Sequence, residues 1–159
     1  MRLYSGFVAG RPRTKGSLTP QPVRNGRGQM KIRMTDTAES RLWLAEMVRS
    51  IRAEVGVKPA VSGRKIVGWA DGWAPIDVPV WVGATFFIDP VWGGHSVEDW
   101  PYPTAADCGD TDKLARAFGD ALTQSGLIKD DRLIVRWSVE KVWKLTGDLA
   151  GVSWILGLS

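Results

Sequence analysis

Apolar and polar residues follow two different periods along the chain, and these periods predict its secondary structure. An alternation of period two, typical of a half-buried strand, marks residues 2–9 and 133–143. Residues 80–88 and 149–158 are nearly continuous in apolar and β-favouring side chains, which favours internal strands of a sheet. We therefore expect four strands in these segments.

Two other segments carry apolar residues at helical spacing. The first begins at Asp36, with Glu39 three residues later as a capping-box partner. Its apolar stripe consists of Leu44, Met47, Val48, Ile51 and Val55. The second lies between Asp110, a suitable N-cap, and Gly126, a suitable helix stop. Its apolar face consists of Leu114, Ala117, Phe118, Ala121 and Leu122.

The order of these elements is strand, helix, strand, helix, strand, strand. This order predicts an α/β (α+β) sandwich in which a mixed β-sheet is covered by two main helices. The length of 159 residues fits a single domain over 1–159. Two long connections, 58–79 and 90–106, carry tryptophans and are expected to be loops. The tryptophans on strand faces, Trp137, Trp143 and Trp154, are expected in the core or at a dimer contact.

Charge is distributed unevenly along a chain whose net charge is only +4. Residues 1–35 contain eight Lys or Arg and no acid, whereas residues 98–131 contain eight acids and three bases. The segment 10–35 is also rich in Gly and Pro, so we expect a basic loop there. This asymmetry predicts that the first segment holds a polyanion and the second holds a metal.

Two acidic pairs flank the second helix, Asp110 with Asp112 and Asp130 with Asp131. Extended residues at i and i+2 point the same way, so the first pair is expected to present its carboxylates side by side. A chain that turns back after the helix would bring the second pair to them. Like charges about 4 Å apart repel by roughly 1 to 4 kcal/mol, so a cation is expected among them. Because no His or Cys cluster offers soft ligands, a hard dication, Mg2+ or Mn2+, is the natural candidate.

These acids belong to a longer joint pattern. It consists of Asp110, Asp112, Leu114, Arg116, Asp120, Ala121, Leu122, Asp130 and Asp131. The pattern resembles that of the RusA family of Holliday junction resolvases, small phage and prophage endonucleases, which is roughly D-x-D-N-L-x-K-x-x-x-D-A-L followed by D-D. The residues Gly10, Pro12, Lys15 and Gly16 are similar to the opening G-x-P-x-x-K-G motif of that family. Two positions differ, because Lys113 and Arg116 stand where the family usually has Asn and Lys.

The resemblance implies a Mg2+-dependent endonuclease that cuts branched, four-way DNA, with Mn2+ as a substitute for Mg2+. It implies that Asp110, Asp112 and Asp131 are the catalytic metal-binding carboxylates. Asp130 is expected to be a further ligand or to support the others, and Arg116 to neutralise charge on the scissile phosphate. The bases expected to hold DNA are Lys15, Arg11, Arg13, Arg24, Arg27, Lys31, Arg33 and Lys113. A four-way junction has two-fold symmetry, and the resemblance implies a homodimer that supplies two matched nicks.

Two other functions fit parts of the pattern. A D-x-D also grips a dication in glycosyltransferases, although this chain is short for one and shows no nucleotide-binding unit. The acids would otherwise be N-caps and surface pairs of a non-catalytic DNA-binding protein. The single cysteine, Cys108, is expected to be buried, and the single histidine, His95, to be a solvated loop residue. No apolar run approaches the roughly 20 residues needed to cross a bilayer, so we expect a protein of the bacterial host cytoplasm with no membrane partner.

Overall fold

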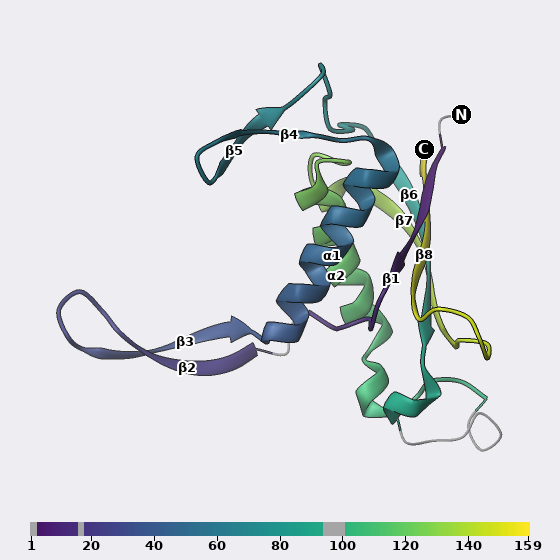
Figure 1. The fold of residues 1–159 in the computed structure, drawn as a ribbon, viewed down its shortest axis with the longest axis horizontal. Helices are drawn as coiled ribbons and strands as arrows, with labels where there is room; N and C mark the ends of the chain where they lie inside the picture. The colour runs from purple at the N-terminus through teal and green to yellow at the C-terminus, as the bar shows by residue number, and fades with distance from the viewer. Residues whose placement is uncertain (1–2, 16–17, 94–100) are drawn as a thin grey trace.

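The computed structural model describes residues 3–15, 18–93 and 101–159, and its centre is a four-stranded mixed sheet (Figure 1). The strand order is β1 (Leu3–Ala9), β8 (Gly151–Leu158), β6 (Val80–Ile88) and β7 (Ile134–Trp143). Strand β8 is antiparallel to both β1 and β6, whereas β6 and β7 are parallel. The predicted strands and the predicted mixed sheet are therefore confirmed.

Helices α1 (Ala38–Val55) and α2 (Thr111–Ser125) pack side by side on one face of this sheet (Figure 1). The alternate β6 residues that face the helices are fully or almost fully buried; they are Val80, Val82, Ala84, Phe86 and Ile88. The whole predicted apolar face of α2 is buried as well. The core thus lies between the helix pair and one sheet face, as the α+β prediction requires.

The helix ends follow ordinary capping chemistry, with one correction. Asp110 and Gly126 bound α2 as predicted, and Gly126 adopts the left-handed conformation with φ of 81°. The prediction that Asp36 begins the first helix is wrong. The N-cap is Thr37, whose hydroxyl oxygen accepts a hydrogen bond from the Ser40 amide at 3.2 Å, and Asp36 is the last residue of a strand.

The prediction of a loop over the basic segment is also wrong in part. Strands β2 (Leu18–Arg24) and β3 (Met30–Asp36) form an antiparallel hairpin there. We call residues 18–36 the arm, because the ribbon extends away from the helices and the sheet (Figure 1). The two prolines of β2 suggested a loop, but proline is compatible with a strand whose outer edge faces solvent.

The connection 58–79 likewise contains a hairpin that was not predicted, formed by β4 (Pro59–Ser62) and β5 (Lys65–Trp69). Its tryptophans pack on the end of α2. The indole of Trp69 lies against Gly126, where a larger residue would collide with it, and Trp73 Nε1 donates a hydrogen bond of 2.8 Å to the Gly126 carbonyl. This connection therefore covers the C-terminus of the second helix.

The remaining predictions concern the second tryptophan-bearing connection and the core. Residues 94–100, which include His95, lie outside the described residues. Trp143 and Trp154 are buried as expected, and Cys108 is 2 % exposed. Trp137 is 38 % exposed and is not a core residue. In the described part of the chain, no helix has the length and apolar character needed to span a membrane.

Candidate functional site

A cavity of about 530 Å3 lies between helix α2 and strand β7. Three of the predicted site residues line it: Asp112 and Arg116 from α2, and Asp131 from η3 (Asp131–Leu133), the 3-10 turn that leads into β7. The other lining residues are Thr111, Ala115, Gly119, Trp137 and Val139. The cavity therefore combines two carboxylates and one guanidinium with a largely apolar wall.

Gly119 allows the second acidic pair to approach the helix. A methyl group at this position would lie 3.5 Å from the indole of Trp137 and 3.7 Å from Cβ of Asp131. Both residues thus sit directly against α2, at the point where it has no side chain. A large residue at position 119 would fill this contact and separate α2 from the start of β7.

The chain topology explains why the two acidic pairs do not meet at one spot. Because β6 and β7 are parallel, the connection between them must cross from one end of the sheet to the other. The 15 residues of α2 rise about 22 Å in doing so. Asp131 reaches back along the helix to Gly119, which lies about 10 Å along the axis from Asp112. The turn back that the sequence suggested therefore brings one member of each pair, Asp112 and Asp131, to one cavity, at separate places in it.

Asp110 lies outside the cavity lining and is paired with Lys113. Its carboxylate forms an ion pair with Lys113 at 2.9 Å, and it is 64 % exposed. The hydrogen bond and charge of Lys113, with a smaller contribution from Lys141, lower the pKa of Asp110 and keep it ionised. The premise that Asp110 and Asp112 lie on extended backbone is wrong, because α2 begins at Thr111 and the two residues straddle its start.

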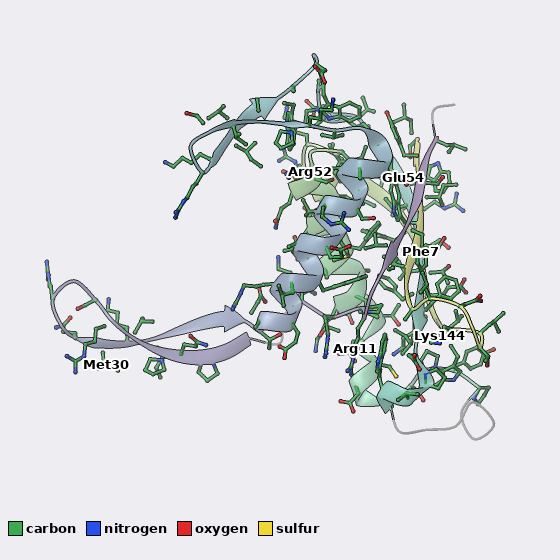
Figure 2. The ribbon with its side chains drawn as sticks, in the orientation of Figure 1. Phe7, Arg11, Met30, Arg52, Glu54 and Lys144 are labelled. Atoms are coloured by element: carbon green, nitrogen blue, oxygen red, sulfur yellow. The ribbon has the colours of Figure 1, made fainter. Side chains whose placement is uncertain are left out.

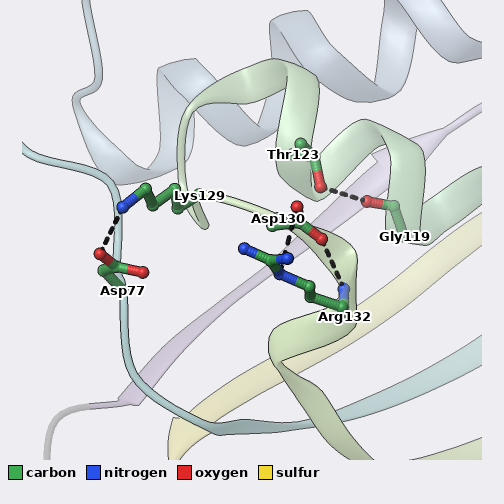
Figure 3. Close-up of polar contacts among 6 residues, drawn as sticks. All are labelled: Asp77, Gly119, Thr123, Lys129, Asp130 and Arg132. Atoms are coloured by element: carbon green, nitrogen blue, oxygen red, sulfur yellow. Dashed lines mark hydrogen bonds and ion pairs between the residues drawn. The ribbon is translucent and has the colours of Figure 1, made fainter.

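The carboxylate of Asp130 binds Arg132 within its own turn (Figure 3). Its carboxylate accepts a hydrogen bond of 3.0 Å from the Arg132 amide and lies 3.4 Å from Arg132 Nε. A neighbouring ion pair joins Lys129 to Asp77 at 2.6 Å. Asp130 therefore stabilises the turn that contains Asp131, and its predicted role as a further ligand or a support of the metal ligands stays a prediction.

The donor chemistry suits a hard dication, although the carboxylates are not gathered around one point. In the described residues, no three His, Cys, Asp or Glu side chains lie close enough together to hold a metal. Asp112 and Asp131 are both exposed and line the same cavity, so each can reorient its carboxylate oxygens toward a bound ion. Asp110 can join them only by leaving Lys113. The metal site thus stays a prediction, with Asp112 and Asp131 as its first two ligands.

Five of the eight bases predicted to contact DNA differ in their surroundings. Lys15, at the root of the arm, forms an ion pair with Asp120 on α2, and its amide donates to the Lys113 carbonyl at 3.4 Å. Arg11 stacks its guanidinium 4.8 Å above the ring centre of Trp92. Arg24, Arg27 and Lys31 are exposed on the arm.

Two of the remaining predicted DNA contacts lie near the roots of the arm. Arg13 lines a polar cavity of about 270 Å3 near the start of α1. Arg33 is in β3, but its side chain lies outside the described residues. Contact of all these bases with DNA stays a prediction.

Two residues of the site were missed from the sequence. Trp137 was assigned to the core or a dimer contact, yet it forms part of the cavity wall. Lys141 donates a hydrogen bond of 2.6 Å from Nζ to the Gly109 carbonyl, which holds an ammonium beside Asp110. A signal for Lys141 was present, because it interrupts the apolar face that Val139 and Trp143 continue on β7.

Comparison with known proteins adds no relative to this picture, since no protein-family model and no curated protein matches the chain. The resemblance to RusA-like resolvases rests on the motif residues of the sequence.

Proposed function

We propose that this protein is a Mg2+-dependent endonuclease that resolves four-way DNA junctions by paired nicks. The observation that carries this proposal is the cavity between α2 and β7, which places Asp112, Arg116 and Asp131 around one space. Asp131 lies 19 residues after Asp112 in the sequence, and both belong with Arg116 to the same resolvase-like pattern. Two carboxylates with an adjacent guanidinium form a donor set that suits a metal-bound phosphate.

Each side chain has a role that follows from its position. Asp112 and Asp131 would hold the dication, and Asp110 would complete the set when Lys113 releases it. A bound Mg2+ would act as a Lewis acid and lower the pKa of a coordinated water. Arg116 lies 3.8 Å from Asp112 and would neutralise charge that builds up on the scissile phosphate. An Arg keeps its proton at all working pH values, so the leaving oxygen must take its proton from another source.

The symmetry of the substrate adds a requirement. A four-way junction is resolved by two matched nicks, so a homodimer with a two-fold axis would place two copies of the cavity in the correct relation. The Lys15–Asp120 ion pair would hold the basic segment close to the acidic helix of the same subunit. DNA bound by Lys15, Arg11 and Arg13 would then lie near the helix that carries Asp112.

A non-catalytic DNA-binding module is the second candidate, and one observation favours it. Lys113 already neutralises Asp110, and it stands where the resolvase pattern usually has Asn. Under this alternative Lys113 stays paired with Asp110, and no dication binds in the cavity. The protein would then bind junctions and cut none.

The two candidates are separated by incubating the protein with Mg2+ and labelled synthetic substrates. The substrates are a four-way junction, a linear duplex of the same sequence, and a nucleotide-sugar as a check on transferase chemistry. We expect symmetric nicks in the junction alone. Binding without cleavage over the full range of Mg2+ and Mn2+ concentrations would favour the binding module, and release of sugar would contradict both.

A further inference from the structure

The arm exposes apolar side chains that no described part of the chain covers. Met30 is 61 % exposed and Ile32 is 75 % exposed. Figure 2 shows Met30 far out on the arm, away from the sheet and the helices. An isolated two-stranded ribbon is only marginally stable in water, so these side chains are expected to gain cover from a partner.

The turn of the arm is nevertheless well organised by one side chain. Asn25 Oδ1 accepts hydrogen bonds from the amides of Arg27 at 3.0 Å and Gln29 at 2.9 Å. Asn25 Nδ2 donates to the Gln29 side chain at 3.0 Å, and Gly28 takes the left-handed conformation that closes the turn. This network fixes Arg27 at the tip, so the ribbon presents its charges from a defined end.

The cross-strand register gives the arm two different faces. Pro22 pairs with Ile32, and Arg24 pairs with Met30, so these four residues share one face. Lys31 pairs with Val23 on the opposite face. The first face is thus apolar along its length and ends in an arginine near the tip.

Two prolines argue against a second strand as the cover. Proline has no backbone N–H, so Pro20 and Pro22 both leave β2 without a donor at the positions that face away from β3. Another chain therefore cannot extend the ribbon along β2 by regular pairing. The outer edge of β3 has no proline, but a strand paired there would not cover the apolar face, so a partner that covers this face must contact its side chains.

The charge of the arm indicates the class of that partner. Arg24, Arg27 and Lys31 are exposed, and no acidic residue occurs before Asp36. Such a surface suits a polyanion. Basic side chains combined with exposed Pro, Ile or Met wedges are the means by which proteins enter the DNA minor groove and open base steps.

We infer that the arm enters the minor groove of one duplex arm of the DNA substrate, with Met30 and Ile32 against the base steps and with Arg24, on the same face, and Arg27, at the tip, at the flanking phosphates. The inference deepens the proposed function and rests on it for the choice of DNA as substrate. Each strand of the arm has seven residues and spans roughly 23 Å, which is long enough to cross a minor groove about 6 Å wide.

The roots of the arm fix its position relative to the candidate site. The Ser40 hydroxyl donates a hydrogen bond of 3.0 Å to the Thr14 carbonyl, which joins the two chain segments at the base of the ribbon. Lys15 is tied to Asp120 on α2. Because Lys15 is tied to the helix that also carries Asp112, a duplex held by the arm would be kept at a set distance from the cavity.

The test compares two charge-matched double variants in binding assays at a series of salt concentrations, with Ca2+ in place of Mg2+. Arg24→Ala/Arg27→Ala removes two charges from the arm, and Arg64→Ala/Lys65→Ala removes two exposed charges from the β4–β5 hairpin. Because each phosphate contact contributes about 0.9 to the slope of log affinity against log salt, we expect the slope to fall by about 1.8 in the arm variant. The control slope should not change, and equal slopes in the two variants would overturn the inference.

The apolar face is tested separately. Met30→Ser/Ile32→Ser should leave the salt slope unchanged but reduce junction affinity about tenfold and reduce duplex bending, measured by energy transfer between dyes at the duplex ends. The control is Leu145→Ser, an equally exposed apolar residue on the β7–β8 connection. A bis-benzimidazole minor-groove dye should compete with the wild-type arm.

Three outcomes separate this inference from the nuclease proposal. If Met30→Ser/Ile32→Ser dissociates a dimer in sedimentation and leaves DNA affinity and bending intact, the face covers a second copy and the inference fails. If the protein nicks junctions but the arm variants bind DNA like the wild type, the arm does not contact DNA and the inference fails, whereas the nuclease proposal is supported. If the wild type never nicks junctions but the arm variant has a smaller salt slope, the arm does contact DNA and the nuclease proposal is overturned.

Discussion

Helix α2 and the arm carry the opposite charges of this chain and differ in what holds their structure together. The face of α2 that includes Phe118 and Leu122 is buried under the sheet and α1, and tertiary packing fixes the acids on its other face. The arm is held by cross-strand pairs and by the Asn25 turn, and almost all of its described side chains between residues 20 and 32 are exposed. The acidic site is therefore as stable as the core, whereas the basic arm can open without unfolding the protein.

The largest expected effect is on stability, which should depend much more on α2 than on the arm. Phe118→Ala removes a fully buried ring from the core and should lower the free energy of unfolding by about 3–5 kcal/mol. Ile32→Ala on the arm should change it by about 0.5 kcal/mol or less, because that side chain is exposed. Urea denaturation of both variants measures the difference. Similar losses would show that the arm packs on the body in solution.

The next effect concerns the chemistry of the cavity. Asp112→Asn removes one carboxylate ligand and should reduce junction nicking at least about a hundredfold. Junction binding should stay the same or tighten, because the substitution also removes a negative charge that faces the phosphate. Asp148→Asn, an exposed acid on the β7–β8 connection, is the matched control. Nicking by Asp112→Asn at the wild-type rate would remove Asp112 from the metal site.

A smaller effect should come from Lys113. Lys113→Asn frees the Asp110 carboxylate and should increase Mg2+ affinity several-fold, measured by calorimetry. It should also raise the pKa of Asp110 toward its ordinary value, since Lys113 is the main cause of the lowered pKa. Because this pKa is lowered in the folded state, the ion pair contributes above the unfolded pKa of about 3.9 and is lost as the pH falls through the folded pKa. Unchanged Mg2+ affinity in Lys113→Asn would show that Asp110 is not a ligand.

The smallest expected effect is at the link between the two regions. Lys15→Ala should weaken junction binding and reduce the salt slope by about 1 if Lys15 also reaches a phosphate. Asp120→Asn frees the same ammonium, so it should keep the slope and bind slightly more tightly. If Lys15→Ala leaves the salt slope at the wild-type value, Lys15 only anchors the arm to α2.

Much of the fold could be predicted because burial leaves a periodic trace. Alternate residues of β6 and the buried face of α2 are fixed by packing against one core, and both elements were predicted within a residue of their ends. The described side chains of the arm form no buried face, so the sequence carried no periodic trace there and its local signals indicated a loop. Pro20 and Pro22 favour a loop in isolation, while the pairing of Gln21 with Arg33 and of Val23 with Lys31 depends on a turn that Asn25 closes through its side chain.

The candidate site was predictable only in part, both in its members and in its geometry. Asp112, Arg116 and Asp131 were identified by spacing, and the structure brings them to one cavity. The separation of Asp110 from that cavity depends on where α2 begins, and the offset of Asp131 depends on the parallel pairing of β6 with β7. Both are properties of the assembled sheet, which a local pattern does not contain.

The hydrogen bond from Trp73 Nε1 to the Gly126 carbonyl has a consequence for how this chain can vary. The last carbonyls of a helix have no donor within the helix, and here a residue from a distant connection supplies one just beyond the end of α2. The connection 58–79 can therefore change in length only where the change leaves Trp73 in place. Arg52 of α1 donates to the carbonyls of Gln124 and Ser125, so a deletion that shifts this tryptophan would remove the donor of the Gly126 carbonyl alone.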